Sequence, residues 1–153
     1  MMAVIQRVRH AAVTADGVDR GACGAGLLLL LGVGVGDTEE DATLLADKIA
    51  KLRIFCDEAG KMNRSLLDVG GEALVVSNFT LCADYTHGNR PDYFAAARPE
   101  VAEPLYEFFL DRIKSNGINA GSGKFGADMQ IEMTADGPVT IVMDSQKLKR
   151  GKH

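Results

Sequence analysis

The strongest constraint on this chain is an almost wholly apolar run between residues 25 and 35, which includes five consecutive leucines and three glycines. A membrane-spanning helix needs roughly 20 apolar residues, so this run is too short to cross a bilayer. A short apolar run of this kind suits a strand that is buried on both faces. We therefore expect a strand at residues 26–35 inside a covered sheet, and no membrane-spanning segment.

Hydrophobic periodicity predicts further strands around this run. Asp16-Gly17 is typical of the tight turn of a β-hairpin, and Asp136-Gly137-Pro138 is interpreted as a turn between the last two strands. Residues 82–98 lack a period and are expected to form an irregular surface loop. The predicted strands are at residues 4–13, 18–22, 26–35, 53–56, 73–79, 125–134 and 139–143.

Two helices are predicted. The first covers residues 38–52, with Asp37 or Thr38 as its cap and Asp41 completing a capping box with Thr38. The second covers residues 99–115, and Pro104 requires either a later start near Val101 or a kink. Strands joined by hairpins, with two helices to cover one side, indicate a single α/β domain over residues 1–144 with a mixed, antiparallel-rich sheet.

Charge is unevenly distributed along the chain. The net charge is −4, but four of the 17 basic residues lie in the tail at 145–153, so residues 1–144 carry −8. A protein that binds a long stretch of phosphate backbone should be basic, so any nucleic acid is expected to be held by a short end. The tail is expected to be disordered, with weak attraction for phosphate as the alternative.

Other residue types exclude several classes of protein. Scattered cysteines and histidines predict no disulfide framework, no metal site and no cofactor. Arg7, Arg9 and His10 precede no apolar signal segment, so a cytoplasmic location is expected. The residues in question are Cys23, Cys56, Cys82, His10, His87 and His153.

Polar residues interrupt the apolar strand at residues 77–81, with Ser77, Asn78 and Thr80 in sequence. Such groups usually satisfy loop backbone, but they also aim hydroxyl and N–H groups into a cleft. Neither Thr80 nor Cys82 has a base next to it in the sequence, which argues against a triad-type nucleophile. Both the structural and the functional interpretations remain open from the residues alone.

Five segments in order together resemble the D-aminoacyl-tRNA deacylase family, formerly called D-tyrosyl-tRNA deacylases. The resemblance runs from Met2 to about Met143 without large gaps. The segments are Ile5-Gln6-Arg7-Val8, Ser77-Asn78-Phe79-Thr80-Leu81, Gly88-Asn89-Arg90-Pro91, Gly123-Lys124-Phe125-Gly126-Ala127-Asp128-Met129 and Asp136-Gly137-Pro138-Val139-Thr140.

The resemblance implies a barrel-like sheet and a homodimer with its active sites at the interface. It implies that the Gly137-Pro138 bond is cis and enters the partner's pocket, where it screens the chirality of the amino acid, and that Arg7 braces it. Residues 77–81 would line the pocket floor, with Asn78 in place of the family's glutamine. Phe125 and Met129 would hold the terminal adenosine, as an apolar pair suits the face of a base.

The implied activity is hydrolysis of D-aminoacyl-tRNA, and of glycyl-tRNA mischarged on tRNA(Ala), at the 3′ end of the tRNA. Ser77, Phe79 and Thr80 are the expected catalytic residues, with the backbone N–H groups near Phe79 and Thr80 facing the oxyanion. The adjacent ribose 2′-hydroxyl would help to activate water. Two alternatives remain: a hydrolase of another ester or amide that uses Thr80 or Cys82, and a module that binds tRNA ends without turnover.

Overall fold

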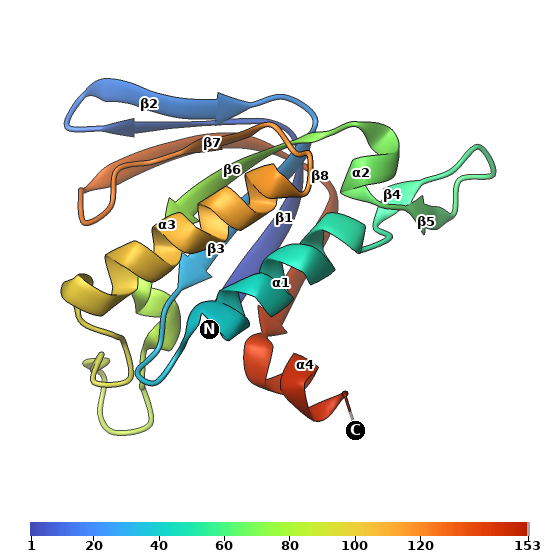
Figure 1. Cartoon of the computed structure of the whole chain (residues 1–153). Coiled ribbons are helices and arrows are strands. Elements are labelled where there is room, and N and C mark those ends of the chain that lie inside the picture. The colour runs from blue at the N-terminus through green and yellow to red at the C-terminus, as the bar shows by residue number, and fades with distance from the viewer. Residues whose placement is uncertain (153) are drawn as a thin grey trace.

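The sheet of this protein is built around one long strand. The computed structural model describes residues 1–152. β1 (Met2–Ala15) pairs antiparallel with β3 (Gly26–Gly32) through its first half and with β2 (Val18–Cys23) through its second half. Along its other edge β1 pairs antiparallel with β8 (Met129–Asp144) over almost its full length. β6 (Glu72–Ser77) and β7 (Ala120–Ser122) add parallel strands beyond β3, in the order β2-β1-β3-β6-β7 (Figure 1).

The sheet curls until its edges approach each other at β2 and β7. Gly21 on β2 makes this approach possible, because a Cβ atom there would lie 2.5 Å from the carbonyl oxygen of Ser122 on β7. On the other side of the contact, a Cβ atom on Gly121 would lie 3.0 Å from the oxygen of Ala22. The two glycines allow the backbones to meet, and the predicted mixed, barrel-like fold is confirmed.

The leucine run is buried on both faces, as predicted. Leu27, Leu29 and Leu31 pack toward the helices, whereas Leu28 contributes to a second apolar cluster with Val8, Val13 and Leu74. The strand ends at Gly32 and not at residue 35, because Val33 to Asp37 form the connection to the first helix. No helix in the described part of the chain is long and apolar enough to cross a membrane.

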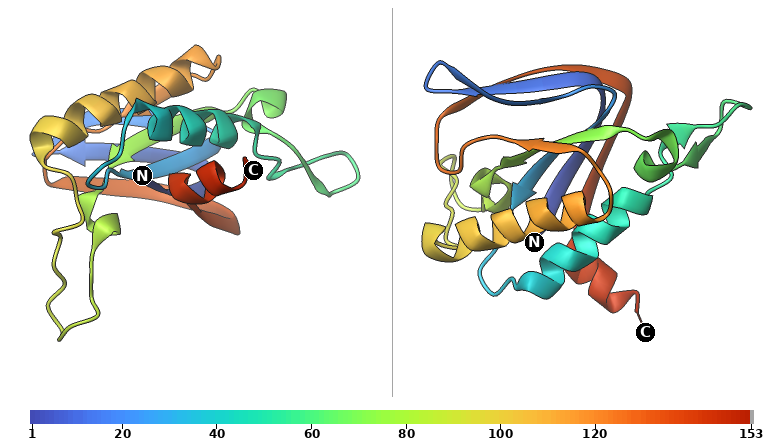
Figure 2. Two further views of the ribbon diagram at one scale, coloured as in Figure 1. Left: turned by 60° about the horizontal axis from the view of Figure 1, so that its bottom comes forward. Right: turned by 45° about the horizontal axis from the view of Figure 1, so that its top comes forward.

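Two helices lie side by side across one face of the sheet (Figure 2). α1 (Glu39–Lys51) has the capping box predicted between Thr38 and Asp41, and it buries Leu45 and Ile49. α3 (Pro99–Ser115) begins at Pro99 and contains Pro104, so the alternative of a later start is wrong. Pro99 at the first helical position costs no hydrogen bond, which favours the earlier start.

The predicted turn at residues 136–138 is wrong. Residues 125–134 and 139–143 do not form two strands, because β8 runs continuously beside β1 from Met129 to Asp144. The register shifts between the pairs Gln6–Thr140 and Val8–Ala135, so the extra residues of β8 form a bulge that includes Gly137-Pro138. Proline and glycine interrupt the ladder locally, and pairing with β1 on both sides keeps the strand intact.

The strand predicted at 53–56 is present but shorter, as β4 (Phe55–Cys56), and it pairs with β5 (Met62–Arg64), which was not predicted. β6 ends at Ser77 and not at residue 79, and an unpredicted 3-10 turn, η1 (Phe79–Cys82), follows it. α2 (Leu66–Val69) has a capping box between Ser65 and Asp68 and ends at Gly70 in the left-handed region. These two features are a sequence signal that would have identified α2.

The tail is helical and not disordered. α4 (Ser145–Arg150) covers most of the segment that was expected to be a solvated end, so that expectation is wrong for residues 145–150. Leu148 packs against the main apolar core, which a solvated tail would not do. His153 lies outside the described residues.

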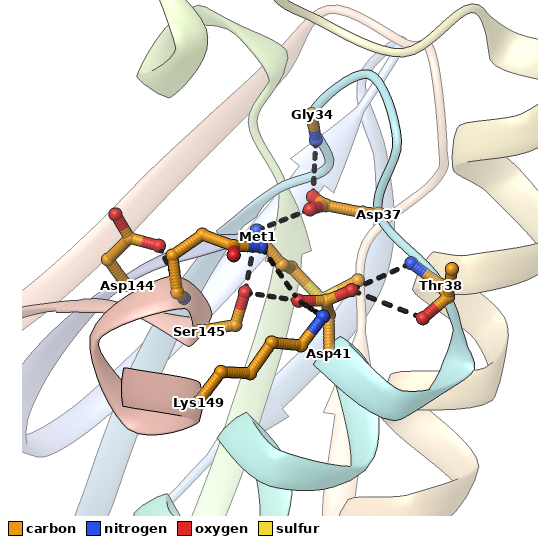
Figure 3. A network of polar contacts seen from close by, with 9 residues as sticks. Met1, Gly34, Asp37, Thr38, Asp41, Asp144, Ser145 and Lys149 are labelled. Carbon is orange, nitrogen blue, oxygen red and sulfur yellow. Dashed lines mark hydrogen bonds and ion pairs between the residues drawn. The ribbon is translucent and has the colours of Figure 1, made fainter. Parts of the chain in front are cut away.

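Buried charges join α4 to α1 (Figure 3). The Asp41 side chain accepts hydrogen bonds from the Ser145 hydroxyl at 2.6 Å and is paired with the Lys149 ammonium at 2.9 Å. The Met1 ammonium donates to Ser145 at 2.9 Å and to Asp37 at 2.7 Å. Burial alone would raise the pKa of Asp41, but the hydrogen bonds from Ser145 and Lys149 outweigh it and lower this pKa to about 2. No local pattern indicates this contact, because Asp41 and Ser145 are 104 residues apart.

Replacing Asp41 with Asn tests this network. The folded pKa lies below the unfolded one, so the ionised carboxylate stabilises the fold at neutral pH and loses that effect as the pH falls toward 2. We expect Asp41→Asn to lower the free energy of unfolding by about 2 kcal/mol at pH 7 in urea titrations. The difference from the parent should shrink below about pH 4. Asp19→Asn, at an exposed carboxylate of β2, is the control and should change little; equal losses in both variants would contradict the network's role.

Candidate active site

A cavity of about 710 Å³ opens where β3 and β6 end. Its walls come from the end of these strands, from η1, from the segment before α3 and the first turns of that helix, and from the loop before β8. The lining is largely apolar, with hydroxyl and amide groups on one side. The lining residues are Leu31, Val33, residues 77–80, Tyr93, Ala96, Ala97, Pro99, Ala102, Tyr106 and residues 125–129.

Residues 77–80 form the polar wall of this cavity. The Asn78 N–H donates to the Leu31 carbonyl at 2.7 Å, which fixes the chain as it leaves β6. The Thr80 hydroxyl donates to the Asn78 side-chain oxygen. The first hydrogen bond of η1 runs from the Leu81 N–H to the Asn78 carbonyl, so the N–H groups of Phe79 and Thr80 precede it and have no partner inside the turn.

Aromatic side chains shape the rest of the cavity. The Phe79 ring is 58% exposed and meets Tyr93 edge-on, with ring centroids 5.1 Å apart. The ring centroids of Phe125 and Tyr106 lie 5.9 Å apart, and the buried Tyr106 hydroxyl donates to the Val75 carbonyl at 2.8 Å. Burial raises the pKa of Tyr106 to about 12, so this hydroxyl stays protonated. Tyr106 was not recognised from the sequence.

Phe125 and Met129 lie in the lining together with Ser77 and Thr80, although almost 50 residues separate the two groups in sequence. A Cβ atom on Gly123 would lie 2.6 Å from the Met129 sulfur, so this glycine leaves room for the methionine. The structure therefore brings together six of the residues named from the sequence: Ser77, Asn78, Phe79, Thr80, Phe125 and Met129.

Within residues 1–152, no side chain hydrogen-bonded to Thr80 or Cys82 is a base that could activate a nucleophile. The partner of the Thr80 hydroxyl is the amide of Asn78, which is no base. Burial raises the pKa of the Cys82 thiol, and the nearby Asp37 carboxylate adds to the effect, so the reactive thiolate is disfavoured. His10 and His87 are both exposed and outside the cavity lining, and the His10 ring contacts Thr134.

The Arg7 side chain holds the bulge of β8 through a backbone carbonyl of the bulge. The guanidinium donates to the Asp136 carbonyl at 3.3 Å and to the Ile54 carbonyl at 2.7 Å, and it also lies 3.3 Å from the Asp136 carboxylate. The Gln6 side chain donates to the Val139 carbonyl at 3.2 Å on the other side of the bulge. The Gly137-Pro138 bond between these contacts is cis.

The bulge and the cavity are separate within one chain. Neither Gly137 nor Pro138 lines the cavity, and neither does Arg7. Both bulge residues are exposed, whereas Arg7 is buried beneath them at 9% exposure. The residues named from the sequence thus fall into two groups, one in the cavity and one on β8.

The curled mixed sheet, its two covering helices and the apolar cavity with one polar wall define a compact α/β protein with a candidate active site. Comparison with known proteins identifies the family. Residues 4–144 match the family described as D-Tyr-tRNA(Tyr) deacylase. The chain belongs to this family. The predicted membership and the predicted class of ester hydrolase are confirmed.

Relatives agree over nearly the full length. A D-aminoacyl-tRNA deacylase of Roseiflexus castenholzii is 61% identical over 145 residues, covering 95% of this chain and 92% of that protein. One of Ruegeria pomeroyi is 57% identical and covers 94% of this chain and 99% of its own. The solved structure of a c-Myc DNA Unwinding Element Binding Protein matches with a TM-score of 0.87 at 40% identity, over 94% of this chain and 98% of that one. A probable eukaryotic D-amino acid tRNA deacylase has a TM-score of 0.81 at 15% identity over the same shares, which shows the shared fold.

Gly137→Ala tests how tightly the bulge is held. A Cβ atom at this position would lie 2.8 Å from the Val139 nitrogen and 2.9 Å from a Val139 methyl carbon, and the residue has a φ of +123°. We expect a loss of about 2–3 kcal/mol in the free energy of unfolding, measured by thermal or urea denaturation. Gly60→Ala is the control, because Gly60 also has a positive φ but no atom near the added Cβ. Equal effects in the two variants would show that the bulge accommodates a side chain.

Proposed function

We propose that this protein hydrolyses the ester bond of D-aminoacyl-tRNA and releases the free amino acid and the tRNA in the cytoplasm. The observation that carries the proposal is the cavity in which residues 77–80 meet Phe125 and Met129. The family match and the names of the relatives point to the same ester.

The 3′-terminal adenosine fits the apolar side of the cavity. Phe125 and Met129 offer an aromatic ring and a polarizable thioether to the face of the base. The aminoacyl ester would then lie toward residues 77–80, where the N–H groups of Phe79 and Thr80, which have no partner inside η1, would stabilise a developing oxyanion. The adenine base would occupy the apolar side of the cavity and the aminoacyl ester its polar side.

The reaction needs little from protein side chains, because an aminoacyl ester is already activated. Water attacks the ester carbonyl and passes a proton to the ribose 2′-hydroxyl, which gives its own proton to the 3′ oxygen as the ester bond breaks. The products are a carboxylic acid and a free ribose 3′-hydroxyl. The cavity contributes orientation and oxyanion stabilisation. This mechanism fits a site in which Thr80 and Cys82 lack a base.

A second copy of the chain would supply the Gly137-Pro138 bulge to the cavity. Within one chain the two are apart, and β8 presents exposed apolar side chains, Ile131, Met133 and Val142, along an edge of the sheet. Exposed apolar surface of this kind is typical of protein–protein contacts. We propose a homodimer with two active sites at the interface.

The bulge would select the chirality of the amino acid with its backbone. Arg7 and Gln6 bind the carbonyls of Asp136 and Val139 on either side of Gly137-Pro138, so the Gly137 and Pro138 carbonyls between them would be held in one direction. These carbonyls accept hydrogen bonds from the α-ammonium group and leave no room for an L side chain. Exclusion of this kind does not depend on which side chain is present. Glycine has no side chain to clash, so glycyl-tRNA mischarged on tRNA(Ala) is also a substrate.

Rates of ester hydrolysis on one tRNA charged with D- or L-tyrosine test the proposed function. We expect rapid release of D-tyrosine, no enzyme-dependent release of L-tyrosine, and measurable release of glycine from glycyl-tRNA. Binding of the tRNA without hydrolysis would support the tRNA-end binding module. Equal hydrolysis of both enantiomers would contradict chiral selection by the bulge.

Loss of either suspected nucleophile should leave the chemistry largely intact. Thr80→Ala and Cys82→Ala should each lower kcat far less than the roughly 10⁴–10⁶-fold that follows removal of a true nucleophile. The measurement is single-turnover hydrolysis of D-tyrosyl-tRNA, with circular dichroism to verify folding. An inactive, folded variant that still binds tRNA would favour the alternative hydrolase with a covalent intermediate.

A further inference from the structure

A second groove lies between α1 and α4, away from the active-site cavity. It has a volume of about 680 Å³ and is lined by residues near the end of α1 and along α4. Five of its ten lining residues are basic, and all five are exposed. They are Lys48, Lys51, Arg53, Lys147 and Lys152.

The positive charge of this groove is not balanced by its own carboxylate. Asp47 is the one acidic residue in the lining, and the Arg112 guanidinium binds both of its oxygens at 2.8 Å. The hydrogen bond from Arg112 holds the pKa of Asp47 at about 2, and Asn116 contributes a further hydrogen bond. Within residues 1–152, none of the five basic side chains has an ion pair of its own. On a chain of net charge −4, five cations in one groove favour an anionic ligand.

The groove has fixed walls. Lys149 and Ser145 bind the buried carboxylate of Asp41 on α1, so α4 is held against that helix (Figure 3). Lys147 is therefore presented from a docked helix and not from a mobile tail. A fixed row of cations loses less entropy on binding a polyanion than a disordered tail does.

The groove also adjoins the bulge of β8. Arg53 in its lining is followed by Ile54, whose carbonyl accepts a hydrogen bond from Arg7 at 2.7 Å. The same guanidinium holds Asp136, the residue before Gly137-Pro138. If the bulge meets the aminoacyl group, as the proposed function requires, nucleic acid that leaves the site beside the bulge reaches the groove next.

We propose that this groove binds the phosphate backbone of the tRNA acceptor stem while the 3′ end occupies the cavity. The inference rests on the proposed function. Lysine ammonium groups contact phosphates as point charges without reading sequence, so the groove would position any tRNA in the same way. A short stem needs only a few phosphate contacts, so this proposal is compatible with the negative net charge of the chain.

Neutralising two of the groove lysines tests this inference. The variant is Lys48→Gln with Lys147→Gln, and the matched control is Lys61→Gln with Lys114→Gln, which makes the same charge change at exposed sites outside the groove. Each is assayed on full-length D-tyrosyl-tRNA and on a short D-aminoacylated oligonucleotide that ends in CCA and has no duplex stem.

For the groove variant, we expect KM on the full tRNA to rise roughly tenfold or more at about 0.1 M salt. The slope of log KM against log salt should fall by about 2. KM on the short oligonucleotide should not change, and the control should match the parent on both substrates. An unchanged KM on full tRNA, or an equal rise in the control, would contradict binding of the acceptor stem by the groove and leave the proposed function standing. Failure of the parent to hydrolyse either substrate would overturn the proposed function and, with it, the inference that rests on it.

Discussion

The pairing of β1 with β8 is the constraint on which the rest of this structure depends. β1 binds β3 and β2 along one edge and β8 along the other, so it joins every strand of the main sheet except β6 and β7. The register of this pairing shifts between Gln6 and Val8, and the shift forces residues of β8 out as a bulge. Arg7 lies at the shift and holds the bulge through the Asp136 carbonyl. One strand thus organises the barrel and positions Gly137-Pro138.

The division of the site into two groups follows from this arrangement. The cavity forms where β3 and β6 end, whereas the bulge forms where β1 and β8 lose register, and the two do not meet within one chain. A protein that requires both groups requires a second copy. The acidic net charge and the basic groove between α1 and α4 agree with the proposed function, in which only a few places on the surface would contact nucleic acid.

Local patterns predicted the local features of the fold well. The leucine run, the capping box at Thr38 and the hydroxyl-rich end of β6 were recognised because each depends on neighbours in sequence.

Long-range contacts explain why the turn predicted at residues 136–138 and the disordered tail were wrong. Asp136-Gly137-Pro138 has the composition of a turn, and only pairing with β1 keeps β8 continuous. α4 begins at a local cap, the Asp144 side chain, and its docking depends on Asp41, over 100 residues away, which binds Ser145 and Lys149. Phe125 and Met129 were predicted only through the family resemblance. Tyr106, which also lines the cavity, was missed because its helix was expected only to pack against the sheet.

Activity of a mixed dimer tests most directly whether two copies build one site. One chain carries Ala127→Trp to fill the cavity, and the other carries Gly137→Ala to disturb the bulge. Each variant alone should hydrolyse D-tyrosyl-tRNA slowly. If the cavity of one chain uses the bulge of the other, the purified mixed dimer contains one intact site and should recover about half of the parent rate per dimer. If each cavity uses the bulge of its own chain, both sites are damaged and no recovery is seen, which would contradict the shared active site.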